Sequence, residues 1–180
     1  MFIVGCINMI GEIKQLISQG YVSKDDSVKT LFKKYLQKAR NNLVTMSLLS
    51  DINTNKKARD LLKIPVEYNS GEWVVITGYY AMYSSALALI AKIGFRSKNH
   101  TATIRLLEEF FIKKRLISNE DLNLLKNAIL QKTEIEKLSD ARHKREIAQY
   151  SVTKQTTKEI AENIMRDAYQ FINKIESIIQ

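Results

Sequence analysis

Apolar residues recur every three or four positions along most of this chain, and that spacing constrains its fold more than any other feature. It is typical of an α-helix with one buried face, because a helix turns once every ~3.6 residues. The clearest stripe runs through the C-terminal segment and comprises Ile160, Ile164, Ala168, Phe171, Ile172, Ile175 and Ile179. No useful length of sequence alternates apolar and polar residues as a strand does, and only 6 Gly and 1 Pro are present. The sequence therefore predicts an all-α fold: an antiparallel up-and-down bundle of four to five helices without a sheet.

Start and stop signals divide this pattern into helices. One helix is predicted from Thr30 to about residue 49, with the stripe Phe32, Tyr35, Leu36, Ala39, Leu43, Met46 and Leu49. Residues 51–70 contain the only proline and are predicted to be a long connection. Ser70 is the predicted cap of a helix that ends at Gly94, and a further helix is expected from about Thr101. Two capping-box patterns, Ser118 with Asp121 and Thr156 with Glu159, predict the starts of the last two helices.

The N-terminal region is predicted to stand apart from the bundle. Residues 8–18 have helical spacing and form an expected arm, while residues 20–28 are polar and are interpreted as a linker. The predicted division is therefore an arm and linker over residues 1–28 and a helical bundle over residues 29–180. Met9 is a candidate alternative start of translation.

Two apolar stretches raise the question of a membrane. The first seven residues lack the basic residues that open a secretory signal. The stretch from Trp73 to Ala91 has no charged residue and is long enough to span, but its Tyr, Ser and Thr groups need partners that a bundle offers. We therefore predict a buried central helix and no membrane association. A single cysteine, Cys6, suits a reducing compartment, so we expect a cytoplasmic protein.

The charge balance favours a polyanionic partner. The chain carries 28 Lys and Arg against 19 Asp and Glu, for a formal charge of +9. Basic residues cluster on the first long helix, at Lys29, Lys33, Lys34, Lys38 and Arg40, and again from Lys113 to Arg115. These clusters are either solvated faces or an RNA or partner surface. There is no phosphate-binding glycine loop and no metal-spaced set of ligands, so no metal and no cofactor are expected.

Three stretches together resemble the HEPN superfamily. The central one is Tyr79-Tyr80-Ala81-Met82-Tyr83, followed by Gly94, the polar turn at 98–100 and residues 106–110. Upstream, residues 35–43 are similar to the family's first helix. Downstream, Ala141-Arg142 and residues 145–150 precede a helix containing residues 168–172, as in the family's last helix. The resemblance covers residues 30–178 and implies a small helical HEPN protein of the kind paired with a minimal nucleotidyltransferase. From the residues themselves, the three tyrosines are interpreted as core and bundle-packing residues.

The resemblance implies that active HEPN proteins are metal-independent endoribonucleases. Their motif is an arginine followed, after four to six residues, by a histidine. An arginine can stabilise the pentacoordinate phosphate, while a histidine with a pKa near neutrality moves the proton of the 2′-hydroxyl. Here Arg145 is followed after four residues by Tyr150 instead of histidine, so these two are the candidate catalytic residues. A phenol has a reference pKa near ~10, which leaves open whether the chain is an enzyme.

The remaining candidates are basic or imidazole groups for binding RNA or a nucleotide: Arg142, Arg96, Lys98 and His100. Three hypotheses follow. The first is an RNA-directed, toxin-like component of a toxin–antitoxin or defence pair, restrained by a nucleotidyltransferase antitoxin. The second is a non-catalytic HEPN module that binds nucleotide, RNA or that partner, and the third is a helical interaction protein. The resemblance also implies a homodimer with the Arg145 to Tyr150 segments facing one cleft.

Overall fold

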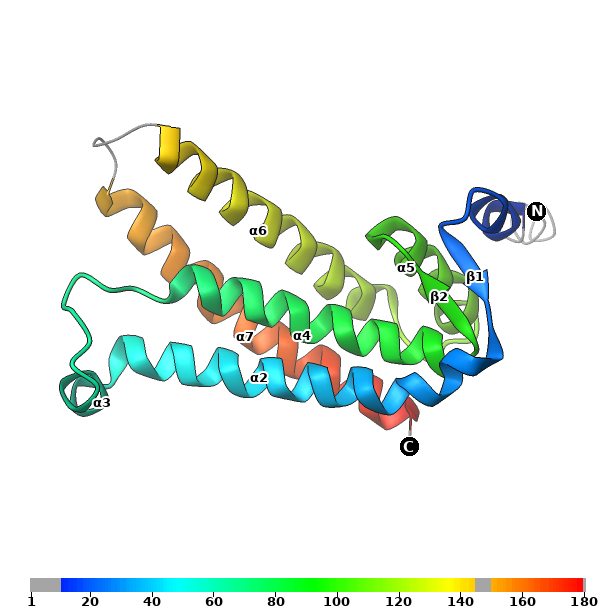
Figure 1. Ribbon diagram of the computed structural model, residues 1–180, viewed down its shortest axis with the longest axis horizontal. Coiled ribbons are helices and arrows are strands. Elements are labelled where there is room, and N and C mark those ends of the chain that lie inside the picture. The colour runs from blue at the N-terminus through cyan, green and yellow to red at the C-terminus, as the bar shows by residue number, and fades with distance from the viewer. Residues whose placement is uncertain (1–10, 145–149, 180) are drawn as a thin grey trace.

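The computed structural model describes residues 11–144 and 150–179 of the chain, and the side chains of residues 138–157 lie outside that description. An N-terminal helix over residues 11–18 leads into a short strand and a 3-10 turn, after which helices dominate. The elements are β1 (Val22–Lys24), η1 (Asp26–Leu31), α2 (Phe32–Thr54), α3 (Lys56–Leu61), α4 (Gly71–Lys92), β2 (Phe95–Ser97), α5 (His100–Leu107), the π-helical turn η2 (Glu108–Ile112), α6 (Asn119–Lys144) and α7 (Tyr150–Ile179). The predicted all-α antiparallel bundle is confirmed (Figure 1).

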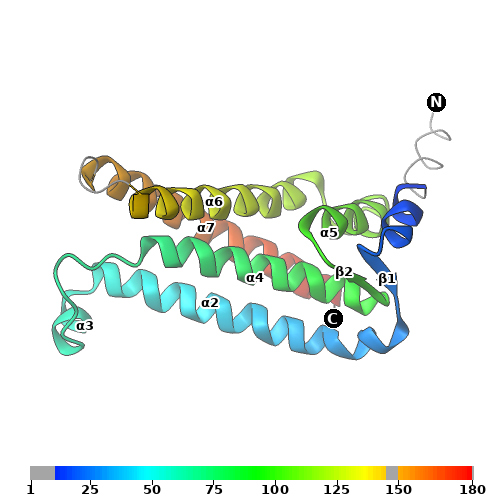
Figure 2. The same cartoon turned by 45° about the horizontal axis from the view of Figure 1, so that its top comes forward.

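Helix α4 is the centre of the bundle. It packs against α2, α6 and α7, and α2 runs antiparallel beside it along most of its length (Figures 1 and 2). Helix α4 is long and apolar enough to cross a membrane by length and composition, but 72% of its most apolar stretch is buried within the bundle. The predicted buried central helix is therefore confirmed, and its burial is that of a helix at the centre of a bundle.

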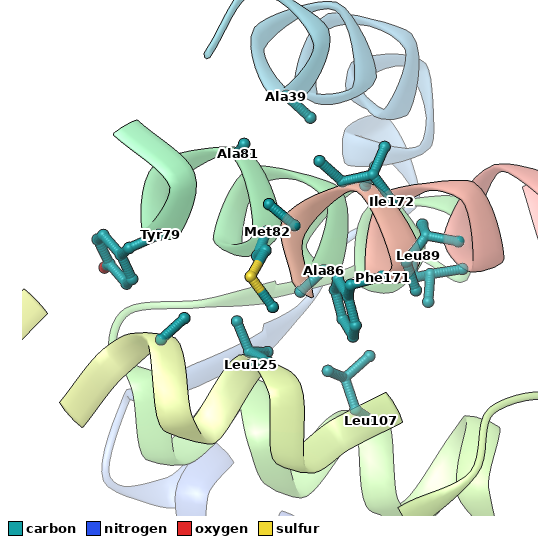
Figure 3. Close-up of a cluster of buried hydrophobic side chains, with 14 of the residues drawn as sticks. Ala39, Tyr79, Ala81, Met82, Ala86, Leu89, Leu107, Leu125, Phe171 and Ile172 are labelled. Atoms are coloured by element: carbon teal, nitrogen blue, oxygen red, sulfur yellow. The ribbon is translucent and has the colours of Figure 1, made fainter. Parts of the chain in front are cut away.

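The core forms where α4, α6 and α7 meet the end of α5. Figure 3 shows Phe171 of α7 among Met82 and Leu89 of α4, Leu107 of α5 and Leu125 of α6. Gly78 allows α4 to approach its neighbours closely, since a Cβ there would lie 2.9 Å from Cγ1 of Ile164 and 3.0 Å from Sδ of Met46. The tyrosine prediction is only partly right: Tyr79 is buried and Tyr83 is half-buried, whereas Tyr80 is 40% exposed.

A two-stranded antiparallel sheet lies at one end of the bundle, where the sequence predicted a linker and no sheet. Strand β1 pairs with β2 so that Ser23 lies opposite Arg96. Gly94 makes the turn between α4 and β2, with φ +81, and its carbonyl accepts a hydrogen bond from the Asp25 amide at 2.8 Å. Strands of three residues are too short to show an alternating pattern, which is why the sequence missed them. Val22 and Val28 are buried, so residues 22–28 pack against the bundle. The boundary at residue 28 stays a prediction.

Some predicted helix ends are correct. Gly94 directly follows the C-cap of α4, as expected. The capping box before α6 is formed in both directions: the Asp121 carboxylate accepts from the Ser118 amide at 3.0 Å, and the Ser118 hydroxyl accepts from the Asp121 amide at 3.1 Å.

Other predicted ends are wrong. Helix α7 begins at Tyr150, so Thr156 is inside the helix and is not its cap. The supposed connection over residues 51–70 contains the end of α2 and the whole of α3. Ser70 does not cap α4 with its side chain, because its hydroxyl donates to the carbonyl of Leu49 at 2.5 Å and to Oδ1 of Asn53 at 2.9 Å. Asn69 replaces it, since its Oδ1 accepts from the Gly71 amide at 2.8 Å.

Candidate functional site

The predicted catalytic pair lies where α6 ends and α7 begins. Tyr150 is the first residue of α7, and Arg142 is in the last turn of α6, which ends at Lys144. Arg145 lies outside the described residues, as do the side chains of Arg142 and Tyr150. The end of α6 and the start of α7 lie at the same end of the bundle as α3 and the start of α4 (Figures 1 and 2). The geometry between Arg145 and Tyr150 stays a prediction.

The other three candidates lie together around β2 and α5. Arg96 is exposed in β2, and Lys98 follows that strand with its amide donating to the carbonyl of Tyr21 at 2.9 Å. His100 is the first residue of α5. Strand β2 and α5 lie away from the junction of α6 and α7 (Figure 1). Lys132 of α6 lowers the pKa of His100 and therefore marks where His100 faces α6. About 18 Å of helix separates Lys132 from Lys144, where α6 ends. The structure therefore does not bring these three residues to Tyr150 within one protomer.

His100 belongs to a polar cluster between α4 and α5. Its Nε2 lies 2.6 Å from the hydroxyl of Tyr79, and its ring centroid is 4.8 Å from that of Tyr83. The Tyr83 hydroxyl lies 3.2 Å from Oγ1 of Thr103, which in turn lies 2.6 Å from Oγ of Ser97. These contacts connect the central helix to β2 and α5, so the cluster positions that corner of the fold.

Burial sets the protonation state of the cluster. Burial first, and the nearby Lys132 ammonium second, lower the pKa of His100 below its ordinary value of 6.5. Burial also raises the pKa of Tyr79 above its ordinary value of 10.0. Both groups are therefore neutral at neutral pH. One ring nitrogen of His100 is already engaged by Tyr79, which favours a structural role for this histidine over proton transfer.

A comparison with protein families identifies the chain. A family model described as the HEPN domain matches residues 52–178. A UPF0332 protein of Archaeoglobus fulgidus is 32% identical over 103 residues, which cover 57% of this chain and 71% of that protein. The chain belongs to the HEPN family. The matched range of the HEPN domain contains the junction of α6 and α7 with Arg145 and Tyr150, whereas residues 35–43, which also suggested the family, lie before it.

The pH dependence of stability tests the role of His100 in the HEPN domain. Its pKa is lowered on folding, so the unfolded chain binds a proton at higher pH than the folded one. The stability that depends on a neutral His100 is complete above pH 6.5 and is lost as the pH falls through the pKa of His100 in the folded state. We expect the free energy of unfolding, measured by urea denaturation, to fall less between about pH 7.5 and pH 5 in His100→Gln than in the wild type. Glutamine keeps a hydrogen-bonding group for Tyr79 without titrating, and identical pH profiles would contradict the assignment.

Charged groups elsewhere on the HEPN domain are partly paired. Lys29 pairs with Asp26 within η1 at 2.9 Å. On α2, Arg40 pairs with Glu176 of α7 at 2.7 Å, so the basic face of that helix is partly neutralised by a residue distant in sequence. Lys33, Lys34 and Lys38 are exposed and form no ion pair among the described residues. Within that same part of the chain, no group of three or more His, Cys, Asp or Glu side chains is arranged to hold a metal.

Sequence reasoning about the HEPN domain missed a set of polar residues around the start of α4. They come from three separate segments and line one cavity: Asn53 from α2, Tyr68 and Asn69 from the loop before α4, and Lys158 and Glu162 from α7. Asparagine near a helix end reads from sequence as a capping signal, which is correct for Asn69. No local pattern could show that these side chains face a common space.

Proposed function

We propose that this HEPN domain acts on RNA as the toxin-like component of a toxin–antitoxin or defence pair, with a minimal nucleotidyltransferase as its antitoxin. The observation that supports the proposal best is the family match, because its range includes the Arg145 and Tyr150 positions. A homodimer with these segments facing one cleft is part of the proposal. Its cellular location would be the cytoplasm.

The proposed chemistry is metal-independent cleavage of the RNA backbone. Arg145 would stabilise the charge of the pentacoordinate phosphate, and Tyr150 stands where active relatives carry the histidine that moves a proton. A phenol with a pKa near ~10 is badly matched to proton transfer at neutral pH. The start of a helix stabilises a negative charge by only about 1 kcal/mol, less than one pKa unit, so the position of Tyr150 at the start of α7 does not close that gap. We therefore expect weak cleavage by the natural protein alone.

A second candidate function is a non-catalytic HEPN module that binds RNA, nucleotide or the nucleotidyltransferase. The tyrosine at position 150 favours this alternative, since it removes the acid–base group on which cleavage depends. Cleaving RNA and binding RNA both require a surface for a polyanion. The two candidate functions differ in whether the RNA is cut.

Binding to RNA should depend steeply on salt, because neutralised phosphates release counterions. Lys33, Lys34 and Lys38 are exposed and form no ion pair with any described residue, which makes them the best candidates for phosphate contacts on α2. Replacing all three with alanine should weaken binding to single-stranded RNA and reduce the slope of log affinity against log salt by about 2. Fluorescence anisotropy over a series of salt concentrations measures both quantities.

A charge-matched control is the triple alanine variant at Lys56, Lys57 and Lys63. These residues are also exposed, but they belong to α3 and the loop after it, at the other end of α2 (Figure 1). An equal loss in the two triple variants would show that net charge and not the α2 face governs binding. Binding that does not respond to salt, or no binding at low salt, would favour the interaction-protein hypothesis.

A further inference from the structure

Helix α4 is covered by other elements on every side but one. In Figures 1 and 2, α2 lies along one flank of α4, α6 lies along the other, and α7 lies behind it. No element of residues 11–144 and 150–179 crosses the first half of α4 on the side opposite α7 (Figure 1). That uncovered side carries Trp73, which is 57% exposed, and Tyr80, which is 40% exposed. Large aromatic side chains this exposed on the central helix of a bundle indicate an interaction surface.

The apolar residues of the uncovered side are spaced as in a seam between two helices. They alternate three and four positions apart and together define the open seam of α4: Trp73, Ile76, Tyr80, Tyr83 and Leu87. Such a spacing places about one residue per turn in a line that a second helix can follow. Ile76, Tyr83 and Leu87 contact the core with part of their surface and remain partly exposed. The open seam therefore matches the footprint of a helix lying along α4.

Polar groups along the open seam already have partners. The Thr77 hydroxyl donates to the carbonyl of Trp73 at 2.7 Å, and the Tyr83 hydroxyl lies 3.2 Å from Oγ1 of Thr103. The helix has no charged residue from Trp73 to Ala91. A ligand on the open seam would thus gain apolar contact and few hydrogen bonds. Trp and Tyr are also among the residue types that contribute most to binding at protein interfaces.

The border between the open seam and α2 is positively charged. Arg40 pairs with Glu176 of α7, so the flank of α2 that carries Arg40 faces α7. Residues two positions apart in a helix point about 200° apart, so Lys38 lies on the opposite flank, beside the open seam. Lys34 is about one turn before Lys38 on that flank, and α2 has no acidic residue from Phe32 to Ser50.

Along α6, the other border of the open seam carries a paired charge. The Lys132 ammonium lies 5.5 Å from the centre of the Tyr79 ring and 2.5 Å from the Glu136 carboxylate. The unpaired positive charge is therefore on the α2 border, where it favours a partner with acidic residues along that edge. A second copy of this chain would instead bring the same lysines, and a formal charge of +9, against the seam.

We propose that the open seam binds an amphipathic helix of a partner protein. Apolar side chains of that helix would pack on Trp73 and Tyr80, and its acidic side chains would lie beside Lys34 and Lys38. An apolar helix face laid into a hydrophobic groove is a common mode of peptide recognition, and the acidic edge would fix its register and disfavour basic partners. The proposal requires neither cleavage of RNA nor a nucleotidyltransferase, so it is independent of the proposed function.

Trp73 is the only tryptophan of the chain and reports directly on whether the open seam is covered. The probe is a designed helical peptide of about 21 residues with Leu at the a and d positions, Glu at the e and g positions, and no Trp or Tyr. Titration of the full chain with this peptide should move the Trp73 emission to shorter wavelength and reach saturation. The same peptide with Lys at the e and g positions should bind at least about tenfold more weakly.

Tyr80→Ala should weaken binding of the acidic peptide by at least about tenfold, because it removes an aromatic anchor from the middle of the seam. Leu130→Ala is the matched control and should leave the affinity unchanged. Leu130 is 61% exposed and precedes Lys132 by two positions, so it lies on the flank of α6 away from Tyr79.

Reversing the charge of the α2 border tests the chemistry of the partner. The double variant Lys34→Glu, Lys38→Glu should prefer the Lys peptide over the Glu peptide, the reverse of the wild type. Both lysines are exposed, so this variant is expected to fold. Circular dichroism verifies folding of each variant, and the double variant decides the matter if Tyr80→Ala does not fold.

No change of emission with the acidic peptide at about 0.1 mM would overturn the proposal, as would equal affinity for the two peptides. An emission shift that grows with the concentration of the protein alone, and that Tyr80→Ala removes, would assign the open seam to a second copy and overturn the proposal as well. So would single-stranded RNA that shifts the emission when the peptide does not. Since no measurement here involves cleavage, an inactive ribonuclease that binds the acidic helix and an active one that does not are separate results.

Discussion

Replacing Tyr150 with histidine should raise metal-independent RNA cleavage by about 10²–10⁴-fold over the natural HEPN domain, because that is the usual contribution of one general acid–base group. The substitution restores the arrangement of Arg145, four residues and a histidine. A histidine has a pKa close to neutrality, so it can both accept and return a proton at pH 7. Cleavage of a labelled single-stranded RNA in excess chelator measures the effect, since the chelator removes metal-dependent nucleases.

Arg145 supplies the control for this gain. Arg145→Ala in the Tyr150→His background should return cleavage close to background, because it removes charge stabilisation needed chiefly in the transition state. In the natural sequence, Tyr150→Phe should eliminate whatever weak cleavage depends on the phenol. Circular dichroism of each variant separates a catalytic loss from a folding defect.

The outcome also decides between the two HEPN functions. A gain in Tyr150→His would show that the scaffold is competent and that the natural protein is attenuated by its tyrosine. If the wild type, Tyr150→Phe and Tyr150→His all leave RNA intact in chelator, the ribonuclease proposal is wrong. The non-catalytic module would then be the better function, and Arg145→Ala would be expected to weaken binding alone.

Phe171→Ala should lower the free energy of unfolding by about 3–5 kcal/mol, the largest stability effect expected from one core substitution in this chain. Phe171 is fully buried and lies where α4, α5, α6 and α7 meet (Figure 3). Replacing the ring with a methyl group removes buried apolar surface. It also leaves a cavity that the four surrounding elements cannot move in to fill. Urea denaturation followed by circular dichroism measures the change.

Asn173→Ala is the matched control, because Asn173 is on the same helix, is exposed and has no side-chain hydrogen bond among the described residues. It should leave stability nearly unchanged or raise it slightly, since alanine favours the helix. A loss below about 1 kcal/mol in Phe171→Ala would contradict the assignment of this contact as the centre of the core.

Much of this fold is readable from periodicity. The stripe from Ile160 to Ile179 and the uncharged stretch from Trp73 to Ala91 predicted one amphipathic helix and one central helix, and both are confirmed. Errors concentrate at helix ends and in short elements. Thr156 shows the reason: its capping pattern is intact in sequence, but α7 begins at Tyr150 and continues through it. A local signal of about 1 kcal/mol does not stop a helix whose apolar face has neighbours to pack against.

The candidate site residues also fall into two groups, one found from a motif and one chosen by residue type. The family resemblance identified Arg145 and Tyr150 as a motif, while Arg96, Lys98 and His100 were added because their residue types suited RNA. The structure separates the second group from Tyr150 and engages His100 with Tyr79 at 2.6 Å. Residue type alone cannot distinguish a binding histidine from one that joins two helices, because the difference lies in which distant side chain it contacts.

The sequence by itself determined the helical class, the central helix and the family, because each depends on residues close together in the chain or on a motif in order. Only the tertiary structure decided that Arg40 of α2 pairs with Glu176, that Ser70 bonds back to α2 instead of capping α4, and that Asn53, Asn69 and Lys158 line one cavity. Those facts depend on contacts between residues up to 136 positions apart, such as Arg40 and Glu176. Helical periodicity shows which face of a segment is buried, but it does not specify the neighbour that buries it.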